Sequence, residues 1–152
     1  MNIENYDFES VLEQGFKSLF AASDIELTIA DDVDLAISDE AITMQIDAGG
    51  PGSDEHLNDA GEYDIYTGSI EIEVRTLRAS IDTVTNSAFK SRQSELVAGT
   101  RQLLEEIDAN ALSTYWGGAI SPTKIKPNGT QRDIDHEFRY TRLSYEMQFR
   151  IT

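Results

Sequence analysis

The chain has 152 residues, with 28 acidic and 12 basic side chains, two His, no Cys and a formal net charge of −16. A chain of this length is expected to form one domain over residues 1–152 with a substantial core. The lack of Cys excludes disulfides, thiolate metal sites and a Cys nucleophile. The acidic N-terminus and the lack of a long apolar run predict a soluble intracellular protein that does not bind phosphate backbones through bulk charge.

The negative charge is concentrated in the first part of the chain. Residues 1–64 carry 17 acidic side chains and one base, Lys17, whereas residues 65–152 carry 11 side chains of each sign. An acidic surface of this kind can aid solubility, repel nucleic acid or imitate it. Charge by itself does not choose among these three interpretations.

The first half reads as one helix followed by strands. Apolar side chains three and four residues apart predict an amphipathic helix over residues 5–22. Its apolar stripe consists of Phe8, Val11, Leu12, Phe16, Leu19 and Phe20. Alternating apolar and polar residues predict strands over residues 25–29, 41–48 and 66–76. Between the last two, the Gly, Pro, Asp and Asn content of residues 49–61 predicts an exposed loop that is disordered or contacts a partner.

The second half predicts a helix and a pair of strands. Residues 80–90 read as a polar connector, and a helix is expected over residues 91–110. Its inner stripe would contain Leu96, Thr100, Leu103, Leu104, Ile107 and Ala111. A strand is expected to begin at Tyr115, and Asn128-Gly129 predicts a tight turn. The final strand, residues 137–151, changes the phase of its alternation near Thr141, which predicts a bulge or bend there.

This order of elements predicts an α+β fold of a single domain. It consists of an antiparallel sheet with two helices packed on one face. No nucleophile elbow, zinc-protease motif or phosphate-binding glycine loop is present, so we do not expect an enzyme or a cofactor.

Two acidic clusters are candidate metal sites, and neither is favoured. Asp133, Asp135 and Glu137 would share one face of a strand while His136 points to the other, so they form no compact triad. The acidic residues of the 49–61 loop lack the spacing of a calcium-binding EF-hand. An aromatic set could stack on nucleic-acid bases, but core packing is favoured because the chain lacks a net basic groove. This set consists of Tyr115, Trp116, Phe138, Tyr140 and Tyr145.

Three segments carry a resemblance to a known family. They are SIEIEVRTLR over residues 69–78, SELVAGTRQLL over residues 94–104, and FRYTRLSYEMQFRI over residues 138–151. Across residues 62–152 the chain resembles small neck proteins of tailed bacteriophages, in particular the tail-terminator type. The resemblance implies a ring, usually a hexamer, that caps the tail tube and joins the tail to the head connector or adaptor proteins.

The resemblance also implies a location and possible contacts. The protein would be assembled in the host cytoplasm and lie in the virion neck, where DNA passes through it without specific binding and no membrane is involved. Candidate subunit or tube contacts are Glu71, Glu73, Arg75, Arg139, Arg142 and Arg150. Glu71 and Glu73 could pair with Arg139 and Arg142 between subunits, or within one sheet.

The alternatives are a head-completion or stopper ring, and an acidic DNA-mimic inhibitor of a nucleic-acid-binding protein. Salt would promote ring formation through apolar contacts and weaken rings held by Glu–Arg pairs. The acidic excess in residues 1–64 favours the first outcome.

Overall fold

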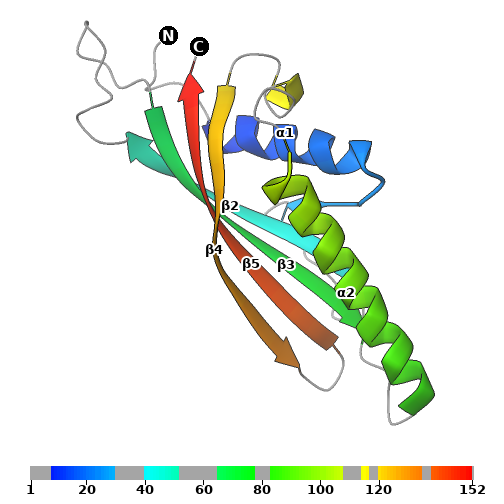
Figure 1. Cartoon of the computed structure of the whole chain (residues 1–152). Coiled ribbons are helices and arrows are strands. Elements are labelled where there is room, and N and C mark those ends of the chain that lie inside the picture. The colour runs from blue at the N-terminus through cyan, green and yellow to red at the C-terminus, as the bar shows by residue number, and fades with distance from the viewer. Residues whose placement is uncertain are drawn as a thin grey trace, which may run out of the picture.

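A computed structural model describes residues 8–29, 40–51, 65–77, 83–107, 114–116, 120–134 and 138–151. Two helices accompany a five-stranded mixed sheet, so the fold is α+β as expected (Figure 1). In chain order the elements are α1 (Phe8–Ala22), β1 (Thr28–Ile29), β2 (Ala41–Pro51), β3 (Ile65–Leu77), α2 (Thr83–Glu105), the 3-10 helix η3 (Thr114–Trp116), β4 (Ile120–Ile134) and β5 (Phe138–Ile151). The predicted loop at 49–61 lies outside the described residues from residue 52 onward.

The strand order is β1-β2-β3-β5-β4. The three pairs β2–β3, β3–β5 and β4–β5 are antiparallel, whereas the short strand β1 pairs with β2 in parallel. The sheet is therefore mostly antiparallel, as expected, and is mixed because of this edge strand. Parallel neighbours need a connection that returns the chain to the same end of the sheet, and residues 30–40 are available for that return.

The pairing of β3 with β5 is continuous from Ile65↔Arg150 to Leu77↔Phe138. The bulge expected near Thr141 is therefore absent from this pairing. Phe138 lies on the sheet face opposite the main core and is nonetheless buried. The Arg75 guanidinium carbon lies 4.9 Å from the centroid of its ring. A cation over an aromatic face is a favourable contact, and it allows an aromatic residue on the face that does not form the main core.

Asn128-Gly129 lies within β4 and not in a tight turn between strands. The register against β5 shifts between Pro127 and Gly129, and Gly129 has a φ of 140°. A second shift follows Pro122. Proline has no N–H to donate to the sheet ladder, so each proline is accommodated by an irregularity. The strand expected to begin at Tyr115 begins instead at Ile120, and Tyr115 lies in η3.

The core combines both helices with one set of alternating strand residues. The predicted stripe of α1 is confirmed at Leu12, Phe16, Leu19 and Phe20. The sheet contributes Ile42, Met44, Ile46, Tyr66, Ile70, Ile72, Val74, Leu143, Tyr145, Met147 and Phe149. Because paired residues in these registers share a face, all of these sheet residues lie on one side, which we call the core face.

Helix α2 begins at Thr83, so the prediction of a polar connector is wrong for residues 83–90. Val84 and Phe89 are the large apolar residues of this part of the sequence. They lie five residues apart, which is not the spacing of a helical stripe, so the sequence gives no helical periodicity here. Farther along, α2 buries Val97, Thr100 and Leu104.

Trp116 connects η3 to α1 through a close packing contact. Its indole Nε1 donates to the Leu12 carbonyl oxygen at 3.3 Å, and its ring meets Phe16 edge to face at a centroid distance of 5.1 Å. The indole also packs directly on Gly15, where any added Cβ would overlap its ring atoms. Only glycine leaves room for the indole at this position.

Candidate functional site

The side of the sheet opposite the core face is polar, and we call it the outer face. Its side chains alternate with the core residues along β2, β3, β5 and β4. The described members with assigned exposure include Thr43, Gln45, Asp47, Ser69, Glu71, Glu73, Arg75, Lys126, Gln131, Asp133, Tyr140, Arg142, Ser144, Glu146, Gln148 and Arg150. Such alternation is typical of a sheet that has one face on the core and one face available to water or a partner.

The six predicted contact residues do not all lie on this face. Every one of them except Arg139 lies on the outer face. Arg139 pairs with Thr76, which places it on the core face at the end of the sheet. The sequence therefore predicted one contact surface for six residues, whereas Arg139 lies on the other side of the sheet from the remaining five.

Glu73 and Arg142 form an ion pair within the sheet. They are direct cross-strand partners, and Arg142 Nε lies 2.9 Å from Glu73 Oε2. The hydrogen bond and charge of Glu73 raise the pKa of Arg142 above its ordinary value. The two side chains retain 38% and 25% exposure, so the pair contributes at most about 1 kcal/mol to stability. Of the two pairings considered for these charges, the one within the sheet is present here.

Glu71 and Arg150 are exposed on the outer face. Glu71 is opposite Ser144, and Arg150 is opposite Ile65 and Ser121. Arg75 is engaged with Phe138 through its guanidinium. The predicted contact set thus divides into residues that hold the sheet together and exposed residues that can meet a partner.

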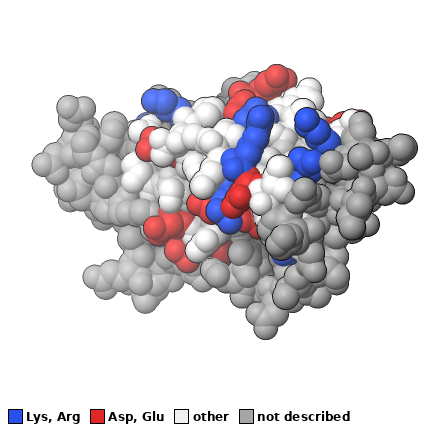
Figure 2. All heavy atoms as spheres, turned by 90° about the horizontal axis from the view of Figure 1, so that it is seen from below, with Lys and Arg blue, Asp and Glu red and all other residues white. Residues whose placement is uncertain are grey.

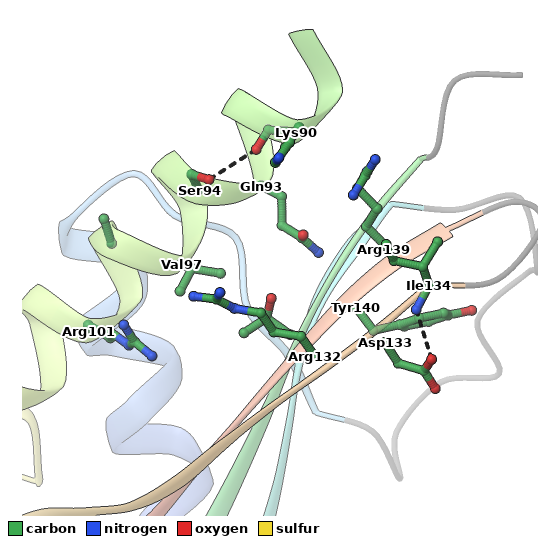
Figure 3. Close-up of a pocket in the computed structure, with 12 residues that line it drawn as sticks. Lys90, Gln93, Ser94, Val97, Arg101, Arg132, Asp133, Ile134, Arg139 and Tyr140 are labelled. Carbon is green, nitrogen blue, oxygen red and sulfur yellow. Dashed lines mark hydrogen bonds between the residues drawn. The ribbon is translucent and has the colours of Figure 1, made fainter. Parts of the chain in front are cut away.

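A second surface is a cleft between α2 and the adjoining ends of β4 and β5 (Figure 3). Its volume is about 260 Å³. Four cationic residues line it, Lys90 and Arg101 from α2, Arg132 from β4, and Arg139 from β5. One acidic residue, Asp133, is also part of the lining. We call this surface the basic cleft.

The side chains of the basic cleft converge from both walls. Arg101 Nη2 donates to Thr130 Oγ1 at 2.9 Å, which holds the guanidinium of α2 beside β4. In Figure 3 the Arg132 side chain extends toward α2, whereas the Asp133 carboxylate points away from it. Asp133 Oδ1 accepts the Ile134 backbone N–H at 2.8 Å. The arrangement concentrates positive charge between the helix and the sheet, and local charge of one sign in a cleft attracts ligands of the other sign.

The basic cleft was not predicted from the sequence, which we interpreted as lacking a net basic groove. Its four cations are far apart in the chain and come from three elements, so no sequence window contains them. The available signal was the equal number of acidic and basic side chains in residues 65–152. Figure 2, seen from below relative to Figure 1, shows Lys and Arg next to Asp and Glu on this end of the molecule.

The aromatic set packs inside the protein as favoured from the sequence, except Tyr140, which is half-buried on the outer face. Trp116 and Tyr145 belong to the core, and Tyr115 packs against it. The Tyr145 hydroxyl donates to Glu105 Oε1 at 3.3 Å. Burial, followed by the charge and hydrogen bond of Glu105, raises the pKa of Tyr145 well above its ordinary value. These rings are not available as a stacking platform.

Within the described ranges, no cluster of three or more His, Asp and Glu side chains could hold a metal ion. His136, with Asp135 and Glu137, lies outside those ranges, as do the acidic residues of the 49–61 loop. No described helix is long and apolar enough to cross a membrane. No protein-family model matches the chain, and no curated protein matches it either.

Proposed function

We propose that this protein is a structural neck component of a tailed bacteriophage, of the tail-terminator type. In this function several copies form a ring that caps the tail tube and joins the tail to the head connector or adaptor proteins. The ring would lie at the head–tail junction of the virion after assembly in the host cytoplasm. DNA would pass through it without specific binding, and no catalysis or cofactor is required.

One observation supports this proposal above the others. The three segments that carry the resemblance form neighbouring elements of one packed unit. β3 and β5 are paired along their whole lengths, and the segment of α2 over residues 94–104 contributes Val97 and Leu104 to the same core. A resemblance distributed over elements that pack together is stronger support than one distributed over unrelated surfaces, because such elements fold as a unit.

The outer face adds a surface suited to subunit contact. It is wide and polar, and it offers exposed charges of both signs, including Glu71, Glu146, Lys126 and Arg150. Complementary charges on adjoining surfaces fix the register and exclude wrong partners more than they add affinity. A ring needs such specificity because every subunit must meet its neighbour in the same way.

The described surface favours polar ring contacts, whereas the acidic excess of residues 1–64 favours salt-promoted apolar ones. Among the described residues, Ile134 is the one large hydrophobic side chain that is exposed, at 51%. The described surface therefore offers little basis for apolar ring contacts. We expect rings held by polar contacts, which added salt weakens by shortening the screening length from about 10 Å at 0.1 M to about 3 Å at 1 M.

The test is to mix the purified protein with preformed tail tubes and examine them by negative-stain electron microscopy. We expect rings at one end of each tube and no further tube growth, with sedimentation showing ring dissociation between 0.05 and 1 M salt. Binding to the head connector without binding to tubes would indicate the stopper ring instead. A compact monomer that inhibits a DNA-binding protein would indicate the DNA mimic. Either result would overturn the proposal.

A further inference from the structure

We propose that the basic cleft of one subunit binds the acidic segment 52–64 of a neighbouring copy, so that the ring closes through head-to-tail contacts. This inference rests on the ring proposed above and names the contact that would hold it. It arises from the opposite charges of the cleft and of segment 52–64, whose attachment points Pro51 and Ile65 lie toward the other end of the sheet.

The basic cleft has the properties of a site for an acidic peptide. Lys90 and Arg132 are exposed in it, and Arg101 and Arg139 are half-buried. Val97 and Ala98 also line it, and the exposed Ile134 adds an apolar side chain beside the cations. Arginine is well suited to carboxylates because its planar guanidinium can donate two parallel hydrogen bonds.

Segment 52–64 has the complementary composition. It contains five carboxylates and no Lys or Arg. These are Asp54, Glu55, Asp59, Glu62 and Asp64. It also contains the apolar residues Leu57 and Tyr63, whose chemistry matches that of the exposed Ile134. Such a peptide can pair its carboxylates with the cations of the cleft, which gives the contact its specificity.

The two parts cannot meet fully within one chain. Segment 52–64 is attached at Pro51 and Ile65, and Ile65 pairs with Arg150 near the end of β5. The cleft is lined by Arg139 and Thr141 near the start of β5. The strand length between these points is about 30–35 Å, whereas a segment tethered at both ends reaches at most about 25 Å.

The cleft and the attachment points of the segment therefore lie toward opposite ends of the sheet, as Figure 1 shows for the ends of β3 and β5. A surface that binds its complement on a second copy produces a heterologous contact. Repeated contacts of this kind form a closed ring when the rotation between subunits closes. The geometry thus agrees with a ring and not with a two-fold symmetric dimer.

The direct test measures binding of a labelled peptide of residues 52–64 by fluorescence anisotropy. We expect the wild-type protein to bind it and the exposed-cleft variant Arg132→Glu to bind at least tenfold more weakly. Lys126→Glu is the matched control, because it makes the same charge change at an exposed position of β4 on the outer face. It should change the affinity less than twofold. Equal weakening by both variants, or binding of duplex DNA without binding of the peptide, would overturn the inference.

The assembly test uses two charge-reversed proteins. One carries Lys90→Glu with Arg132→Glu, which changes the cleft from four cations and one carboxylate to two cations and three carboxylates. The other carries Asp54→Lys, Glu55→Lys and Asp59→Lys, which leaves the segment with three cations and two carboxylates. Neither protein should form rings alone, because its cleft and its segment then carry net charges of the same sign. The mixture should form rings of alternating subunits, since each reversed surface meets its complement on the other protein.

The results separate this inference from the proposed function. If the wild type and both variants all form rings on tail tubes, the contact is wrong and the tail-terminator function stands. If the wild type forms no ring on tubes while the peptide still binds the cleft, the proposed function is wrong and the contact stands. Far-UV circular dichroism of each variant confirms that it has folded.

Discussion

The contact between Trp116 and Gly15 makes the sharpest prediction about stability. Gly15→Ala would place a Cβ where the indole now lies, so the indole must move. Overpacking typically costs about 1–3 kcal/mol, and the loss of the Trp116–Leu12 hydrogen bond costs about 1 kcal/mol. Alanine recovers about 1 kcal/mol through its higher helix propensity. We expect a net loss of about 2 kcal/mol in the free energy of unfolding.

The assay is urea denaturation followed by the fluorescence of Trp116, which is the single Trp of the chain. For a protein of this size the loss corresponds to a decrease in Tm of about 4–8 °C. Gly99→Ala in α2 is the matched control. An added Cβ there would lie 3.3 Å from Ile25 Cδ1, the end of a flexible side chain. The control should be neutral or stabilising by up to about 1 kcal/mol.

A second background separates packing from other effects. In the Trp116→Leu background unfolding is followed by far-UV circular dichroism, because no Trp remains. The smaller side chain leaves space at Gly15, so Gly15→Ala should lose most of its cost. The difference between the two backgrounds is the coupling energy of the pair. If Gly15→Ala is as stable as the wild type, or costs the same in both backgrounds, the assigned packing of the indole is incorrect.

Three further predictions concern the sheet. Met147→Asp buries a carboxylate at a position with 2% exposure and should destabilise the fold by about 4 kcal/mol or more, whereas the exposed Gln148→Asp should change stability by less than about 0.5 kcal/mol in urea denaturation. Because the pKa of Tyr145 is raised in the folded state, the unfolded state loses the phenolic proton first, so stability should fall as the pH rises through about 10; Tyr145→Phe should abolish that decline. Gly129→Ala, at a φ of 140°, should cost about 1 kcal/mol in thermal denaturation, and Asn128→Ala should cost less than half of that.

The sequence alone determined the elements whose burial repeats with a regular period. The stripe of α1 and the alternation of β2, β3 and β5 each follow from one-sided burial against the core, which leaves a pattern in consecutive residues. The same reasoning correctly predicted that Met147 is buried and Gln148 exposed. For the candidate contacts, the sequence could name charged residues on strands but not the face or the partner of each one.

Tertiary structure decided the features that depend on distant residues. The phase change at Phe138 and Tyr140 predicted a bulge. The strand is instead regular there, and Phe138 is buried on the outer side of the sheet beneath Arg75 of the neighbouring strand. The Asn-Gly pair looked like a turn, yet it lies inside β4 beside a proline that interrupts the ladder. The pairing of Glu73 with Arg142 and the gathering of cations from α2, β4 and β5 into one cleft depend on strand register and helix packing. Strand register and helix packing bring residues together in space independently of their separation in the chain, so no local sequence pattern could reveal these contacts.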